Sequence, residues 1–163
     1  MRLGDSLRRL RRCRLCLQRR GALLLAGPLV QAGVPSRNGR SYDRAALVAE
    51  TASYVLQQEN LYGAFQHPAP GAPHYSRTPA ELASHRIVPE SLCWDGDTLT
   101  GSFEVLPTAA GRALVLAYLL GTELGASLRG WSLPASGASE FQLSTFDVVT
   151  EPAFPGCVLH TVE

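Results

Sequence analysis

The stretch from residue 85 to residue 121, HRIVPESLCWDGDTLTGSFEVLPTAAGRALVLAYLLG, decides the fold class of the chain. We interpret residues 85–93 and 98–106 as two strands. The Asp-Gly-Asp between them, at 95–97, is typical of a compact hairpin turn, because glycine adopts the backbone conformations that such turns need. The stretch therefore predicts an antiparallel pair of strands rather than part of a helical bundle.

Helices are expected on both sides of this hairpin. Downstream, Thr108 is placed to cap a helix that runs to Leu120, and Gly121 is placed to end it. Upstream, residues 43–58 carry apolar side chains at helical spacing, and Asp43 is placed to cap them. The sequence therefore predicts two or three helices packed against the strands.

The remaining segments add further strands and loops around this centre. They are strands at 21–32 (broken at the Gly-Pro of 27–28), 61–66, 124–132 and 140–149, and loops at 33–42 and 68–80. The order of strands, helix, strands, helix and strands predicts a mainly β fold of the α+β class. We expect a small antiparallel β-barrel with the helices packed on it.

Charge divides the chain into two parts. Residues 1–20 hold eight arginines against one aspartate, a net charge of +7, whereas the remainder holds seven arginines against thirteen acids, a net charge of −6. The length of 163 residues suits one domain with a real core. We therefore predict a flexible Arg-rich arm at 1–20 and a single folded domain at 21–163.

The arm has two interpretations that the sequence leaves open. It can bind nucleic acid or an acidic protein surface, or it can be a solvated terminus. Its Cys13-x-x-Cys16 is half of a zinc-ribbon pattern without a second pair, so we interpret it as a chance pair and expect no metal site.

No apolar run is long enough to cross a membrane. The run at 21–30 is too short, and Pro28 interrupts it. No good signal-peptide cleavage site follows this run. The sequence therefore favours an intracellular protein with no membrane partner.

Three polar residues fit the chemistry of nucleophilic catalysis. Such catalysis needs a hydroxyl beside an imidazole, and a third group that orients the imidazole. Ser127, His67 and Asp147 supply these groups, and the apolar neighbours of Asp147 favour its burial beside a partner. Each residue also fits an ordinary role: a strand serine, a loop histidine and an aspartate on an exposed strand face. The residues alone leave both interpretations open.

Six blocks in order point to a known family. They are 37–42 (RNGRSY), 62–68 (YGAFQHP), 84–87 (SHRI), 101–111 (GSFEVLPTAAG), 124–130 (LGASLRG) and 143–152 (LSTFDVVTEP). Together they make the chain resemble the prohead core proteases of tailed phages, which are similar in fold to the herpesvirus maturation protease assemblin. The resemblance covers about three quarters of the chain.

This resemblance implies an assemblin-like barrel and a serine endopeptidase that acts through an acyl-enzyme, with no cofactor. On the matching positions His67 is the general base and Ser127 the nucleophile. Asp147 stands where assemblins carry a second histidine, and it can hold the tautomer of His67. For the oxyanion hole, Arg129 and the Gly130 amide are the nearest candidates by sequence.

Two positions depart from the family pattern. Ala64 replaces an acid and Leu128 replaces a second serine; neither is a member of the triad, but each lies beside one, so the sequence leaves open whether activity is lowered or altered. His85 falls on a block position without known chemistry, and we interpret it as structural.

The resemblance also implies partners. The expected substrates are scaffold and major capsid proteins and the protease itself, cleaved inside the phage prohead in the bacterial cytoplasm. Assemblins dimerise through a helix, so a homodimer is compatible with this resemblance, as is nucleic-acid binding through the Arg-rich arm.

A rival interpretation comes from another class of protein. A non-catalytic capsid-assembly protein could keep the fold and bind scaffold or DNA through its basic arm. An esterase is a more distant alternative, because the serine block lacks the second glycine of the Gly-x-Ser-x-Gly elbow.

Overall fold

The computed structural model describes residues 22–57, 61–132 and 141–162. The predicted arm at 1–20, with its cysteine pair, lies outside the described residues. The elements follow one another as β1 (Leu24–Gln31), α2 (Arg44–Gln57), β2 (Tyr62–Gly63), β3 (His85–Ile87), the 3-10 turn η2 (Pro89–Ser91), β4 (Cys93–Asp95), β5 (Thr98–Val105), α3 (Ala109–Leu119), β6 (Gly125–Ser132), β7 (Phe141–Val149) and β8 (His160–Thr161).

The described strands form two antiparallel sheets. The larger sheet has the order β2-β3-β5-β1-β8, with β4 also paired to β5, and the smaller one is the β6-β7 pair. Isolated bridges join Phe65 to Val148 and Gly125 to Val158. The mainly β, α+β class is therefore confirmed, but the predicted barrel is not found among the described strands. Because only isolated bridges connect them among the described residues, the two sheets do not merge into one closed sheet.

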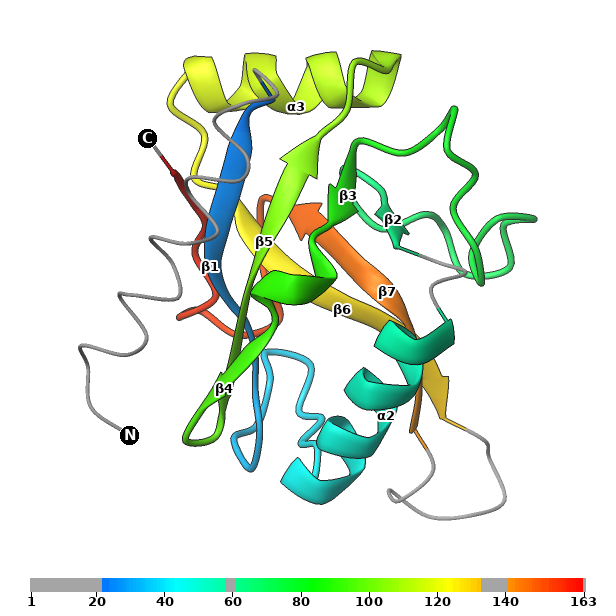
Figure 1. Ribbon diagram of the computed structural model, residues 1–163, viewed down its shortest axis with the longest axis vertical. Helices are drawn as coiled ribbons and strands as arrows, with labels where there is room; N and C mark the ends of the chain where they lie inside the picture. Colours follow the sequence, from blue (N-terminus) through cyan, green and yellow to red (C-terminus); the bar gives the residue numbers. More distant parts are fainter. Residues whose placement is uncertain (1–21, 58–60, 133–140, 163) are drawn as a thin grey trace.

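One hydrophobic core joins the two described sheets to helices α2 and α3. Leu25 of β1, Phe103 of β5 and Phe146 of β7 are buried in it, together with Leu47 of α2 and Leu114 of α3. Figure 1 shows α3 across the upper ends of β1 and β5, and α2 at the opposite end of the molecule, beside the lower parts of β6 and β7. Burial of each such side chain stabilises the fold by roughly 1.5–3 kcal/mol. This burial holds the β6-β7 pair against the larger sheet.

The local signals in the sequence are confirmed. The Asp43 carboxylate accepts from the Ala46 amide at 3.1 Å, and the Thr108 hydroxyl accepts from the Gly111 amide at 2.9 Å. Gly121 ends α3 with a φ of 83°, a left-handed conformation that glycine adopts without a steric penalty. These caps set where the helices begin and end.

The strand boundaries differ from the prediction where proline intervenes. The predicted strand at 85–93 is divided by η2, because Pro89 has no N–H to continue the ladder. By contrast, β1 runs unbroken through Pro28, which a bulge between Pro28 and Val30 accommodates. The predicted strand at 61–66 is reduced to β2, and β8 was not predicted because it has only two residues.

Candidate active site

The β6-β7 ladder places Ser127 opposite Asp147. These two residues are Cα partners in the antiparallel register, so their side chains project from the same face of the pair. Both are almost completely buried. Two residues that are twenty positions apart in the sequence are thus held side by side by backbone hydrogen bonds.

His67 reaches this pair from a segment that runs along the other edge of β7. The Val148 amide donates to the Ala64 carbonyl at 3.1 Å, and the Gln66 amide donates to the Val148 carbonyl at 2.8 Å. Gln66 has a φ of 68°, which is uncommon for a residue with a side chain. Its side-chain amide also donates to the Thr150 hydroxyl at 3.1 Å. This turn directs the next residue, His67, over the strand pair.

The three side chains form one chain of hydrogen bonds. His67 Nδ1 lies 2.7 Å from Asp147 Oδ2, and His67 Nε2 lies 3.1 Å from Ser127 Oγ. Because a carboxylate only accepts, Nδ1 carries the proton and Nε2 is left to accept from the serine hydroxyl. The His67 side chain is 41% exposed whereas that of Asp147 is 0% exposed. The site is therefore open to solvent at the imidazole and closed at the carboxylate.

Asp147 is held by two further groups. The Ala64 amide donates to Oδ1 at 2.8 Å, and Arg129 Nη2 donates to the same oxygen at 3.0 Å. Arg129 Nε lies 2.9 Å from Oδ2, an ion-pair contact whose geometry falls short of a hydrogen bond. Both ionised side chains are fully buried, and such a pair is tolerated only where its remaining polar atoms are also satisfied.

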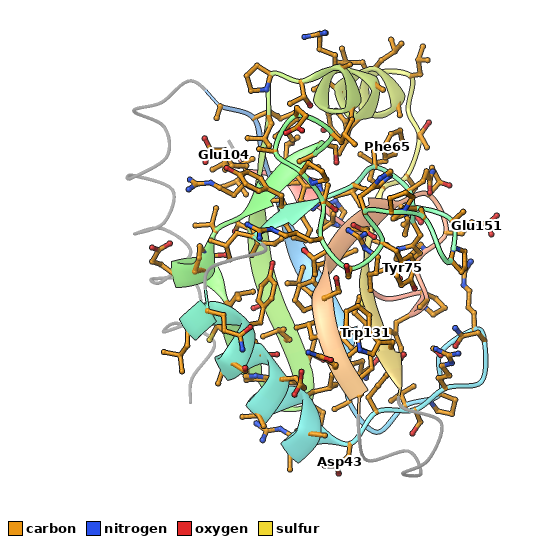
Figure 2. The ribbon with its side chains drawn as sticks, turned by 90° about the vertical axis from the view of Figure 1, so that its right-hand side faces the viewer. Asp43, Phe65, Tyr75, Glu104, Trp131 and Glu151 are labelled. Carbon is orange, nitrogen blue, oxygen red and sulfur yellow. The ribbon has the colours of Figure 1, made fainter. Side chains whose placement is uncertain are left out.

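Main-chain and side-chain oxygens of the 74–78 segment satisfy the rest of the Arg129 guanidinium. Nη1 donates to the His74 carbonyl at 3.2 Å and to the Tyr75 carbonyl at 2.8 Å, and Nη2 donates to the Thr78 hydroxyl. In Figure 2 the labelled Tyr75 lies over the β6-β7 pair. The Arg129 side chain is thus engaged by Asp147 and the 74–78 segment, an arrangement that does not favour the predicted oxyanion role, which stays a prediction.

Gly130 is also badly placed for that role. It lies three residues beyond Ser127 along β6, which is about 10 Å of extended strand. An oxyanion donor must lie within hydrogen-bond distance of the reacting carbonyl oxygen. Gly130 instead packs against Phe141 and the Gln142 carbonyl of β7. Nearness in sequence did not predict nearness to the serine hydroxyl.

The two departures from the family pattern leave these contacts intact. Ala64 holds Asp147 through its main-chain N–H, which any residue except proline provides. Leu128 pairs with Phe146 in the ladder and, by the alternation of strand side chains, projects from the face opposite Ser127. Neither side chain lies between members of the triad.

His85 supports the site through the backbone of Phe146, the residue before Asp147, in agreement with its structural interpretation. Its ring is fully buried, donates from Nε2 to the Phe146 carbonyl at 3.0 Å, and lies 2.8 Å from the Ser84 hydroxyl through Nδ1. Burial lowers the pKa of His85 from its ordinary 6.5 to about 4, although the Phe146 carbonyl opposes this change. The neutral ring therefore ties β3 to the residue that precedes Asp147.

A pH-dependent loss of stability is expected from His85. Because the folded state resists its protonation, the unfolded state binds more protons between pH 6.5 and pH 4. The free energy of unfolding should therefore fall by about 2 kcal/mol at pH 5 and about 3 kcal/mol at pH 4 from this residue alone. Urea unfolding of wild type and His85→Gln across this range measures the difference. The variant should lack this component, and exposed His160→Gln should retain it; equal slopes in wild type and His85→Gln would contradict the assignment.

Gly63→Ala is expected to destabilise the same support. A Cβ at residue 63 would collide with His85 Nε2 and with the Phe146 carbonyl, and neither can move without losing their hydrogen bond. We expect a loss of about 3 kcal/mol, at the upper end for an overpacked core, measured by urea unfolding. Gly156→Ala is the matched control, because a Cβ there would contact nothing. A Gly63→Ala protein as stable as this control would refute the packing argument.

Other kinds of site are not formed by the described residues. Within residues 22–57, 61–132 and 141–162, no group of three or more histidine, cysteine or acidic side chains is arranged to hold a metal ion. No helix in these ranges is both long and apolar enough to cross a membrane.

The fold is shared with a phage capsid protease. A solved structure of the capsid assembly protease of bacteriophage T4, gp21, superposes with a TM-score of 0.63 over 78% of this chain and 82% of that one, at 23% sequence identity. No protein-family model and no curated protein matches the sequence. This match supports a fold like that of a phage capsid protease. The resemblance to assemblin stays a prediction.

Proposed function

We propose that this protein is a serine endopeptidase, with Ser127 as nucleophile, His67 as general base and Asp147 as the group that orients His67. The observation that carries this proposal is the unbroken chain of hydrogen bonds from Asp147 through His67 to Ser127. Its order and distances are those that nucleophilic catalysis by serine requires.

The chemistry follows from the positions of the protons. Ser127 Oγ attacks the carbonyl carbon of a peptide bond while its proton moves to His67 Nε2, which gives a tetrahedral adduct. Collapse breaks the C–N bond, and His67 returns the proton to the departing amine, leaving an acyl-enzyme. Water activated by His67 then hydrolyses the ester. The buried negative charge of Asp147 stabilises the imidazolium that forms in each step.

The proposed substrates are scaffold and major capsid proteins during phage prohead maturation. The neighbour in fold is described as a capsid assembly protease, and the six sequence blocks are similar to those of prohead proteases. We place the activity in the prohead interior, where confinement raises the local concentration of substrate. The arm at 1–20 is a proposed aid to incorporation into the prohead, and a homodimer stays compatible with the resemblance.

A fluorophosphonate probe tests the proposal with the intact chain. The Ser127 oxygen should displace fluoride from phosphorus, with His67 accepting the hydroxyl proton, and mass analysis of peptides should find the adduct on Ser127 alone. Incubation with scaffold and capsid protein should then yield discrete fragments. Wild-type protein that is folded yet takes up no probe would overturn the protease function and favour a non-catalytic assembly protein.

A further inference from the structure

We infer that Arg129 is a positioning residue that couples the 74–78 segment to Asp147, so that docking of this segment and alignment of the triad are one event. The inference rests on the proposed protease function. Its observation is that a single buried guanidinium bonds Asp147 on one side and three oxygens of the 74–78 segment on the other.

The spacing along β6 explains why Arg129 can reach both sides. It lies two residues after Ser127, hence on the same face of the strand, and its Cα partner is Thr145, two residues before Asp147. The planar fork of arginine offers five N–H donors in fixed directions. A lysine at this position would offer three donors from one atom and could not serve both sides.

The contacts on the two sides depend on each other. Arg129 is fully buried, so undocking of the 74–78 segment would leave guanidinium N–H groups without acceptors or admit water beside Asp147. An unpaired buried donor on a charged group is costly. The guanidinium would therefore turn with the segment, and Asp147 would lose the bonds that hold its carboxylate toward His67.

Chain connectivity adds a second link. The 74–78 segment follows His67 after only six residues, and these include Pro68, Pro70 and Pro73. The segment is thus joined to His67 through the backbone and to Asp147 through Arg129. On the two sides of His67 in the sequence, Phe65 bridges to Val148 of β7 and the Ser76 carbonyl accepts from Ser144 of β7. A displaced segment would disturb both partners of the His67–Asp147 hydrogen bond.

Thr78→Val tests the coupling, because it removes one acceptor of Arg129 with little change in shape and touches no member of the triad. The matched control is Thr100→Val, the same substitution in the β4-β5 hairpin, which removes a hydrogen bond to the Cys93 carbonyl and leaves the 74–78 segment untouched. With a fluorophosphonate, we expect kinact of Thr78→Val to fall about tenfold at unchanged KI. The control should stay within twofold of wild type, and Thr78→Ser, which keeps the hydroxyl, should restore the rate.

A second variant covers the case in which Thr78→Val does not fold. Arg129→Lys keeps the charge and should lower kinact about a hundredfold among folded molecules. Wild-type kinact in either folded variant would overturn the inference, as would an equal loss in Thr100→Val and Thr78→Val.

A spectroscopic readout separates this inference from the proposed function. The proton that His67 Nδ1 shares with Asp147 should give a low-field NMR resonance, which Thr78→Val should shift or broaden and Thr100→Val should not. This result does not require catalysis. If Ser127 takes up no probe while the resonance responds as expected, the protease function fails and the coupling stands. An unaltered resonance in Thr78→Val refutes the coupling alone.

Discussion

Ser127→Ala and His67→Ala are each expected to lower peptide cleavage by about a millionfold, which amounts to complete loss in a practical assay. In the first variant no oxygen remains to form the acyl-enzyme. In the second the hydroxyl has no acceptor for its proton, since His67 Nε2, the proposed base, is the atom that lies 3.1 Å away. Hydrolysis of scaffold and capsid protein, followed by gel electrophoresis, and uptake of a fluorophosphonate measure both effects.

The double variant decides whether these residues act as one unit. Ser127→Ala/His67→Ala should be scarcely worse than either single variant, because removing one member already disables the other. His160→Ala, which changes an exposed histidine outside the site, should keep wild-type activity. Losses that multiply in the double variant, or cleavage that survives Ser127→Ala, would rule the mechanism out.

The parts of the fold that depend on local chemistry could be predicted from the sequence. The hairpin turn at 95–97 and the caps at Asp43 and Thr108 are decided by a few adjacent residues. The pairing of β1 with β5 and with β8 could not be predicted, because strand partners are set by packing between distant segments. The barrel prediction failed for this reason: the strands were found, but not which edges they share.

The candidate site divides in the same way. Ser127, His67 and Asp147 were singled out from residue types and family blocks, and their proximity follows from the β6-β7 register, which no local pattern contains. Closeness in sequence to Ser127 predicts an oxyanion role for Arg129, whereas its side chain contacts Asp147 and the 74–78 segment. Its spacing of two residues from Ser127 already put both side chains on one face. Thr78 was missed, because nothing local distinguishes a loop threonine that accepts from a buried arginine.

The burial of Asp147 changes what its substitution is expected to do. The sequence alone predicts that Asp147→Asn keeps the fold and lowers turnover by about three to four orders of magnitude, as a misplaced tautomer does. The structure adds a cost in stability, because asparagine is neutral and leaves the Arg129 charge buried without a counter-ion. Breaking a buried pair on one side costs roughly 3–5 kcal/mol.

We therefore expect Asp147→Asn to lose both activity and stability, and a second substitution should separate the two losses. In Arg129→Met/Asp147→Asn the uncompensated charge is gone, while the asparagine oxygen can still accept from the Ala64 amide. Urea unfolding should show that the double variant recovers about 1–3 kcal/mol relative to Asp147→Asn. Uptake of fluorophosphonate per folded molecule should stay at least a thousandfold below wild type in both variants, because neither has a carboxylate to hold His67. Wild-type stability in Asp147→Asn would contradict the buried ion pair, and recovery of activity in the double variant would contradict the role of Asp147.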